Sequence, residues 1–480
     1  MKKSKVFLLA TVGLLSVGVL TACSSSSKTS GKTYNYVYGG DPATLDYVST
    51  NKKNMTTAVS NGVDGLFEND QYGNLKPSVA ENWSVSQDGL TYTYKIRKGV
   101  KWYTSDGEEY ANVTAKDFVT GLKHAADTNS EAIYLLQNSV KGLNDYLSGA
   151  NKDFSNVGIK AVDDYTLQYT LSQPEPYWNS KLTYSVTWPV NEDFLKSKGK
   201  DFGKSTDPTS ILYNGPYLLK SLTTKSSIEF TKNENYWDKD NVYFDTVKLT
   251  YDDGTDQESL ERNFTDGVYN LARLYPTSSN YSKVKKQYKD NIFYTQPGAA
   301  VEGVGVNIDR QTYDHTSKEN DQQKTSTKTA LLNKDFRQAL GFAIDRTNYA
   351  AQLNGKEGGS TAVRNIFVKP DFVQADGKDF GTMVMDQLPA YGDEWSGVNL
   401  ADSQDGLYNP EKAKAEFAKA KEALQAEGVQ FPIHLDVPVN QSNKIFVNQV
   451  QSLKQSIESA LGKDNVVLDL HQLSTDDFYN

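Results

Sequence analysis

The sequence predicts an α/β protein with more than one domain, and three observations lead to this prediction. The chain has 480 residues, which is enough for about three domain-sized units. Its first half contains short segments in which apolar and polar side chains alternate, a pattern typical of β-strands. Its last third alternates strand-like segments with amphipathic helical patterns, which favours an α/β lobe.

The composition is that of a soluble globular protein with an acidic balance. Hydrophobic residues make up 38% of the chain and charged residues 23%, and the formal net charge is −9. This charge argues against nucleic acid as a partner, because nucleic-acid binding needs basic surface. The 30 tyrosines suit a groove for ligands of mixed polarity, although β-sheets also favour tyrosine and we expect most of them to be structural.

The N-terminus has the pattern of an export signal. Lysines at positions 2, 3 and 5 precede an apolar stretch, residues 6–20, that is too short for a comfortable transmembrane helix. Cys23, the only cysteine, follows a small residue, and this junction resembles the lipobox of bacterial lipoproteins. The resemblance implies that residues 1–22 are a lipoprotein signal peptide and that Cys23 carries lipid. Residues 23–32 would then tether the body flexibly to the outer face of the cell membrane. The alternative is a plain signal peptide followed by an accidental cysteine.

The first strand is predicted at residues 34–38. It breaks at Gly39, Gly40, Asp41 and the proline that follows, a sequence that does not continue a strand. A strand that ends in a glycine pair is a place where the sheets of α/β proteins present ligands, but an ordinary turn explains these residues equally well.

Residues 62–180 are predicted to form a compact α+β unit. Asp88-Gly89 predicts a hairpin turn, and the residues after it alternate in polarity. Thr114 and Asp117 have the spacing of a capping box in front of a helix. We interpret the alternation in this region as packing rather than chemistry.

Two longer helices are predicted in the last third. Asn333 is expected to cap a helix over residues 334–353. Asn409, with Pro410 at the first helical position, is expected to begin a second helix that stops at Gly428.

The other segments are expected to be strands and loops. Strands are predicted at residues 304–306, 432–437 and 466–470, and the polar residues 314–329 are expected to be a surface insertion. Three aspartates at positions 252, 253 and 256 could hold calcium, but their spacing is not that of an EF-hand loop. We favour a solvated turn there.

Several motifs together resemble one family. They are LTYTYKIRKGVKW at 90–102, VTAKDF at 113–118, YNGPY at 213–217, NYW at 235–237 and DFRQALGFAIDR at 335–346. From about residue 34 to the end, the chain is similar to the bacterial extracellular solute-binding proteins of family 5 that deliver peptides to ABC transporters. Within that family the resemblance is strongest to the oligopeptide-binding lipoproteins of streptococci, the Ami/Ali type.

This resemblance implies a two-lobed periplasmic-binding-protein-like fold of type II with an extra inserted domain. Residues 33–61 and 181–266 would form lobe I, residues 62–180 the domain inserted into it, and residues 267–480 lobe II. Lobe II is expected to be C-terminally incomplete, because a family segment that holds the amino end of the peptide lies beyond residue 480 in the usual alignment. The implied function is capture of oligopeptides in a cleft between lobes that close by a hinge.

The resemblance also implies partners and candidate residues. The expected partners are oligopeptides, the permease and ATPase subunits of an ABC transporter, and the membrane through the lipid anchor. We expect a monomer that has no cofactor, no metal site and no enzymatic activity. The candidates carried over for peptide binding are Tyr38, Gly39, Gly40, Asp41, Tyr213, Asn214, Arg273, Tyr275, Asn307, Arg364 and Asn365.

Other classes of function find less support in the residues. The four histidines are far apart in sequence, and the spacings typical of metal or nucleophile motifs do not occur. A surface glycosidase with paired carboxylates remains conceivable only because 60 acidic residues always supply some pair. A peptide-sensing or adhesion lipoprotein is compatible with the same fold. So is a protein that binds dipeptides, sugars or nickel complexes.

Overall fold

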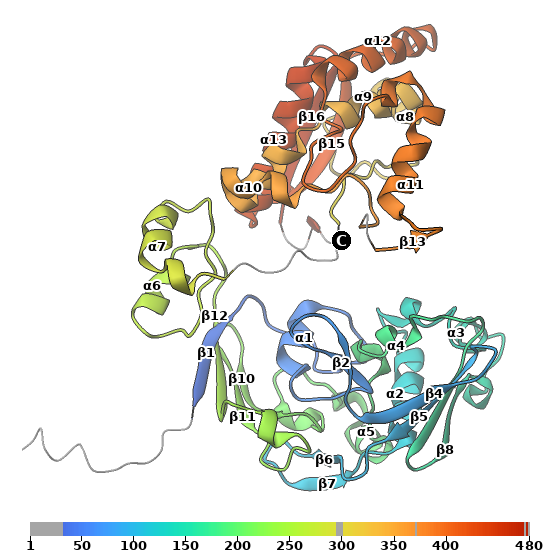
Figure 1. Cartoon of the computed structure of the whole chain (residues 1–480), viewed down its shortest axis with the longest axis vertical. Helices are drawn as coiled ribbons and strands as arrows, with labels where there is room; N and C mark the ends of the chain where they lie inside the picture. Colours follow the sequence, from blue (N-terminus) through green and yellow to red (C-terminus); the bar gives the residue numbers. More distant parts are fainter. Residues whose placement is uncertain (1–31, 294–300, 370–371, 475–476, 479–480) are drawn as a thin grey trace, which may run out of the picture. The chain divides into compact units, whose positions relative to one another are not determined.

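The computed structural model describes residues 32–293, 301–369, 372–474 and 477–478 (Figure 1). The chain divides into two compact units, residues 1–272 and residues 273–480, which are described separately below. The predicted signal peptide, Cys23 and nearly all of the tether lie outside the described residues. Within the described part of the chain, no helix combines the length and the apolarity needed to cross a membrane.

The strands and α-helices have the following bounds. The strands are β1 (Thr33–Tyr38), β2 (Phe67–Asn69), β3 (Leu75–Pro77), β4 (Ala80–Val85), β5 (Thr91–Ile96), β6 (Lys101–Tyr103), β7 (Glu109–Asn112), β8 (Ile159–Asp163), β9 (Thr166–Thr170), β10 (Tyr217–Thr223), β11 (Ser227–Lys232), β12 (Thr246–Tyr251), β13 (Gln374–Ala375), β14 (Lys378–Asp379), β15 (Ile433–Asn440) and β16 (Val466–Leu473). The helices are α1 (Lys53–Val59), α2 (Ala115–Asp127), α3 (Leu143–Leu147), α4 (Trp178–Lys181), α5 (Glu192–Lys198), α6 (Ser259–Thr265), α7 (Tyr281–Gln287), α8 (Asp321–Leu332), α9 (Lys334–Ala343), α10 (Arg346–Gly358), α11 (Phe380–Gln387), α12 (Pro410–Ala426) and α13 (Lys444–Leu461).

Unit 1 contains two four-stranded sheets. The first has the strand order β1-β12-β11-β10, in which β1 runs parallel to β12 and the other pairs are antiparallel. The predicted strand at residues 34–38 is therefore confirmed, and its partner comes from more than 200 residues later in the chain, since Thr33 pairs with Thr246. The sheet joins the beginning and the end of unit 1.

The second sheet of unit 1 lies within residues 62–180 and has the order β4-β5-β9-β8, all antiparallel. The predicted alternation on β5 is confirmed, because Tyr92, Tyr94 and Ile96 are buried while the residues between them are not. The predicted hairpin turn is also confirmed, with Gly89 at φ +71°. These buried rings and the apolar stripe of α2 belong to one continuous core that extends through unit 1.

Helix α2 begins with the predicted capping box. The Asp117 carboxylate accepts a hydrogen bond of 2.8 Å from the backbone N–H of Thr114 and another of 3.1 Å from the Trp102 indole. Burial raises the pKa of Asp117 to about 6, although these hydrogen bonds oppose the shift. The Asp117 carboxyl therefore caps the N-terminus of α2 and also accepts a hydrogen bond from a fully buried tryptophan of β6.

A buried polar network around Asp64 joins three loops of unit 1. Asn214 Oδ1 accepts a 2.8 Å bond from the Asp64 N–H, and Asn214 Nδ2 donates a 3.2 Å bond to the Asp64 carbonyl oxygen. The Asp64 carboxyl accepts hydrogen bonds from the Tyr236 hydroxyl at 2.8 Å and the Trp237 indole at 3.3 Å. Burial raises the pKa of Asp64 to about 7. The sequence motifs at 213–217 and 235–237 thus meet at one residue, the first at the backbone of Asp64 and the second at its carboxyl.

Unit 2 is built on a parallel pair of strands, β15 and β16, with helices packed around it (Figure 1). The two strands predicted at 432–437 and 466–470 are confirmed, and each ends three residues later than expected. Helix α12 begins as predicted, with the Asn409 side chain accepting from the Lys412 N–H. The core of unit 2 includes Phe336 from α9 and Phe417 from α12, whose ring centroids are 6.2 Å apart.

Three predictions about unit 2 are wrong in part. The helix expected over residues 334–353 is broken at Ile344, where ψ is +112°, and Asp345 caps a new helix by accepting from the Asn348 N–H at 2.8 Å. Residues 314–329 are not only a surface insertion, because α8 begins at Asp321 and buries part of its length against β15. Residues 304–306 belong to no strand, although their sequence alternates.

The three aspartates at 252, 253 and 256 lie in a turn. Each accepts a hydrogen bond from a backbone N–H two residues ahead, at 2.7 to 3.0 Å, and Asp256 also pairs with Arg262. Among the described residues, no group of three or more His, Cys, Asp or Glu could hold a metal ion.

The close packing of α2 predicts a strong effect of one added methyl group. A Cβ at Gly121 would lie 2.2 Å from the backbone oxygen of Trp188, so Gly121→Ala should lower the free energy of unfolding by about 3 kcal/mol. The control is Gly341→Ala in α9, because a Cβ at that position has open space. This substitution should leave the free energy of unfolding unchanged or raise it by about 0.5–1 kcal/mol. Chemical denaturation of both variants tests this. Equal stabilities of the two variants would contradict it.

The raised pKa of Asp64 predicts a pH dependence of stability. The folded state holds a proton on Asp64 up to about pH 7, whereas an aspartate in the unfolded chain releases it near the ordinary pKa of 3.8. Between these two pKa values the folded state therefore binds more protons than the unfolded state. The contribution of Asp64 to the free energy of unfolding falls as pH rises through that window, by on the order of 4 kcal/mol. Asp64→Asn should remove that slope. Unfolding free energies of the protein and the variant at pH 4 to 7.5 decide it, and parallel curves would refute the assignment.

Candidate functional site

Four sequence candidates lie together where β1 ends in unit 1. The Tyr38 hydroxyl donates to Asp41 Oδ1 at 3.0 Å, and both Asp41 carboxylate oxygens accept from the Lys225 N–H, at 3.1 and 3.0 Å. Burial, followed by the hydrogen bond to Asp41, raises the pKa of Tyr38 to about 12. Lys225 has φ +50°, so the carboxylate also holds a strained turn between β10 and β11. A Cβ at Gly40 would lie 2.6 Å from Nδ2 of the exposed Asn54 side chain, which would have to move aside.

The side chains of Tyr213 and Asn214 lie in the core of unit 1. Tyr213 is fully buried, its hydroxyl donates to the Pro208 carbonyl oxygen at 2.7 Å, and its backbone forms a bridge with Tyr103. The amide oxygen and the amide nitrogen of Asn214 both form hydrogen bonds with the backbone of Asp64. Both residues therefore position their loop. Direct contact of these residues with a ligand stays a prediction.

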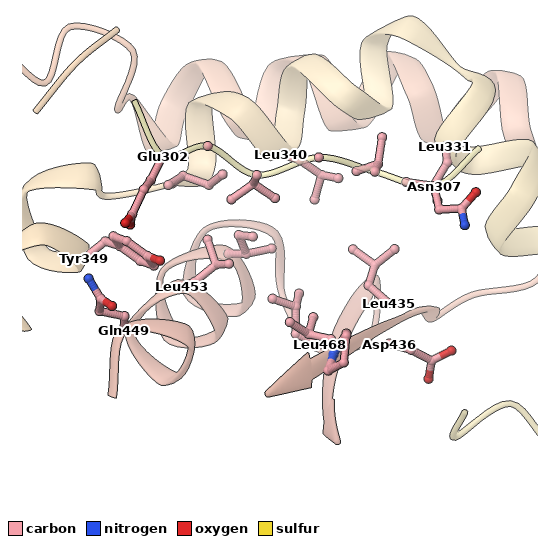
Figure 2. A pocket seen from close by; sticks show the side chains of 18 of the residues that line it. Glu302, Asn307, Leu331, Leu340, Tyr349, Leu435, Asp436, Gln449, Leu453 and Leu468 are labelled. Carbon is pink, nitrogen blue, oxygen red and sulfur yellow. The ribbon is translucent and has the colours of Figure 1, made fainter. Parts of the chain in front are cut away.

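Unit 2 contains a cavity of about 1340 Å³ that is lined entirely by residues of that unit (Figure 2). It is bounded by the segment that includes Glu302 and Asn307, by α8, α9 and α13, and by β15 and β16. Three sequence candidates, Asn307, Arg364 and Asn365, line it together.

Arg364 and Asn365 are held in place by a loop near residue 402. The Arg364 Nε lies 3.4 Å from Asp402 Oδ2, and the Asn365 amide donates to the carbonyl oxygens of Ala401 and Gln404 at 2.9 and 2.7 Å. The other amide atom, Asn365 Oδ1, is buried and has no hydrogen-bond partner in the described structure.

The cavity also contains charged groups that the sequence reasoning missed. Asp436 of β15 accepts from Lys318 Nζ at 2.6 Å, from Arg310 Nη1 at 2.5 Å and from His471 Nε2 at 2.9 Å. Burial opposes ionisation of Asp436, but the hydrogen bonds from Lys318, the Ser317 N–H, His471 and Arg310 outweigh it and lower the pKa of the carboxyl. No local motif marks this cluster, because Arg310 and Lys318 lie more than 100 positions before Asp436, and His471 lies 35 positions after it. The one available signal was an aspartate inside a predicted strand.

A second missed group lies at the break between α9 and α10. Arg346 donates to the Gly341 and Ile344 carbonyl oxygens, which are left free where α9 ends, and it lies 3.8 Å from Asp405. Burial lowers the pKa of Arg346, and Asp405 opposes that shift. Further along α10, burial raises the pKa of Tyr349, and the charge of Glu302 adds to the rise.

The last two candidates, Arg273 and Tyr275, lie apart from this cavity. They contact each other, with the Arg273 guanidinium 4.8 Å from the centre of the Tyr275 ring. Arg273 is exposed and Tyr275 is partly buried. Such a cation–π pair presents a flat, charged surface to solvent.

Comparison with known proteins places the chain in one family. Residues 74–467 match the family model described as bacterial extracellular solute-binding proteins, family 5 Middle. "Oligopeptide-binding protein AmiA" of Streptococcus pneumoniae serotype 4 is 68% identical over 483 residues, which cover 100% of this chain and 73% of that protein. "Oligopeptide-binding protein SarA" of Streptococcus gordonii is 61% identical, with coverage of 100% and 74%.

Solved structures show the same two-lobed fold. The pheromone receptor PrgZ matches with a TM-score of 0.68 and 23% identity, covering 94% of this chain and 78% of its own. Listeria monocytogenes OppA bound to peptide matches with a TM-score of 0.67 and 24% identity, covering 93% and 78%. The predicted fold class is therefore confirmed, and together with the streptococcal relatives these matches show that the chain belongs to the bacterial extracellular solute-binding proteins of family 5.

Proposed function

We propose that this protein captures oligopeptides outside the cytoplasm and passes them to the permease of an ABC transporter. The observation that carries the proposal is the identity of 58–68% along the whole chain to streptococcal proteins named as oligopeptide-binding. A dipeptide-binding relative of Lactococcus lactis matches at only 30% over 436 residues, so the longer ligand is favoured. The peptide leaves the protein chemically unchanged.

The proposed capture relies mainly on hydrogen bonds to the main chain of an extended peptide. Water fills the space around the peptide side chains. Arg273, with an exposed guanidinium, offers a set of charge-assisted donors. Such a group does not require a particular peptide side chain. Recognition of this kind tolerates many sequences, which suits a nutrient carrier.

We also propose that Cys23 carries the lipid that holds the protein at the outer face of the membrane. The support is the pattern of basic residues, apolar stretch and single cysteine in residues 1–23. One acyl chain alone gives marginal binding, so the modified cysteine would carry more than one.

The proposed capture predicts that oligopeptides stabilise the protein. At a peptide concentration 100 times Kd, the stability should rise by about 2.7 kcal/mol and the melting temperature by a few degrees. Thermal melting with pools of short peptides measures this. Mass spectrometry of small molecules that co-purify should find peptides of unchanged mass.

Arg273 allows a sharper version of the same test. Arg273→Ala should weaken peptide binding several-fold without lowering the melting temperature of the peptide-free protein, because the side chain is exposed. The matched control is Arg262→Ala, another exposed arginine, which pairs with Asp256. Melting shifts that are absent for all peptides, or recovery of only metal or sugar, would rule out oligopeptide capture.

The proposed lipid anchor predicts that replacing the sulfur atom of Cys23 by oxygen changes where the protein is found. Cys23→Ser should release the protein from the cell surface into the medium, since the hydroxyl cannot form the thioether. Cell fractionation and incorporation of labelled fatty acid measure the outcome, with Ser24→Ala as the control. Unchanged membrane association of the serine variant would contradict the anchor.

A further inference from the structure

Two exposed aromatic side chains follow each other in the connection between β11 and β12. Tyr243 is 67% exposed and Phe244 is 37% exposed. They come directly after the partly buried Val242, so residues 242–244, called the aromatic loop below, form a short apolar segment at the surface of unit 1. One exposed aromatic residue is ordinary in a soluble protein, whereas neighbouring exposed apolar residues indicate a surface that contacts something other than water.

The aromatic loop is fixed by side chains of its own unit. Lys232 Nζ donates to the Val242 carbonyl oxygen at 3.1 Å, and the Tyr217 hydroxyl donates to the Phe244 carbonyl oxygen at 3.0 Å. The Phe244 ring also contacts Tyr34 of β1, with the ring centroids 5.4 Å apart. Two backbone carbonyl groups of the loop therefore have partners without water, which a segment needs if it is to enter an apolar medium at low cost.

The described chain begins beside the aromatic loop. The Asp245 carboxylate accepts from the Lys32 N–H at 2.8 Å, and the Asp245 N–H donates to the Lys32 carbonyl oxygen at 2.8 Å. This pairing continues into the parallel ladder of β1 and β12, which lie side by side in Figure 1. Cys23 lies nine positions before Lys32. Nine residues span at most about 32 Å even when fully extended, so a lipid on Cys23 keeps the aromatic loop close to the bilayer.

The chemistry of the aromatic loop fits the boundary between lipid and water. A tyrosine has an apolar ring and a polar tip, and aromatic side chains gather at the level of the lipid headgroups. Charge does not supply the attraction, because Asp240 and Asp245 flank the loop and the whole chain has a net charge of −9. The rings must therefore provide the affinity. A weak affinity is enough, since an anchored group meets the bilayer at a high effective concentration.

We propose that the aromatic loop rests in the headgroup region of the bilayer that holds the lipid of Cys23, with Tyr243 and Phe244 as the side chains that enter it. This inference rests on the proposed lipid anchor and adds a second contact to it. The opposite end of β1, with Tyr38, lies about 17 Å away along the strand. Contact of the aromatic loop with lipid therefore leaves the candidate peptide-binding residues at that end uncovered.

The test uses the full lipidated chain in phosphatidylcholine vesicles that contain a lipid with a photoactivatable acyl chain. After illumination and digestion, mass spectrometry locates the lipid adducts along the chain. We expect adducts to concentrate in the peptide that contains residues 242–244. The double variant Tyr243→Ser, Phe244→Ser should lower them at least about tenfold, because full burial of one such ring corresponds to that factor or more.

Matched variants separate lipid contact from a change of fold. Tyr243→Ser alone removes a ring that is mostly in solvent, so it should lower the adducts several-fold and leave the melting temperature unchanged. Phe244→Trp keeps an aromatic ring and should preserve the adducts. Tyr72→Ser removes a 76% exposed ring from the turn between β2 and β3, which belong to another sheet, and should have no effect.

Three results would overturn the proposal. Adducts spread evenly over the surface would mean that the body does not rest on the bilayer at this loop. Adducts that require phosphatidylglycerol in the vesicles would assign the contact to basic side chains instead of the rings. Protection of the loop from hydrogen exchange in native cell membranes but not in vesicles would mean that a protein covers it.

The same samples separate this inference from the proposed anchor. In all three cases labelled fatty acid remains on Cys23, so the anchor stands while the contact of the aromatic loop with lipid falls. Absence of that label would remove the anchor and this inference together. Neither result affects oligopeptide capture, which the melting shifts and co-purifying peptides test separately.

Discussion

The buried pairing between Asn214 and the backbone of Asp64 is the contact on which unit 1 depends. One amide side chain pairs with both backbone polar groups of a residue that lies 150 positions earlier in the chain, and both residues are buried. The same aspartate then receives Tyr236 and Trp237. Three loops that differ widely in sequence position are thereby fixed at one point. Strand β10 begins directly after the loop that carries Asn214.

Much of the fold could be predicted from local sequence. Alternation placed β5, and capping residues placed α2 and α12, because these patterns lie in side chains that are close together in sequence. The break at Ile344 could not be seen from the same rules, since the apolar spacing continues across it. The local cap by Asp345 is joined there by a long-range contact, since Asp405 accepts from the Thr347 N–H at 2.8 Å and lies beside Arg346.

The candidate sites show the same division between local and distant causes. The family motifs correctly indicated segments of importance, but for Tyr213 and Asn214 the importance visible in the structure is structural. Asn307, Arg364 and Asn365 meet at one cavity, as a shared role requires. The prediction of a strand at residues 304–306 failed because alternation describes what a segment can do, whereas strand formation needs a partner edge. The domain boundaries stay a prediction.

The carboxylate of Asp436 has a consequence for the electric field inside unit 2. It is surrounded by one lysine, one arginine and one histidine, so the group as a whole carries at least one excess positive charge in a chain whose net charge is −9. Little solvent reaches Lys318, whose side chain is 2% exposed, so this charge is weakly screened. A carboxylate that approaches this end of the cavity is attracted and an ammonium group is repelled.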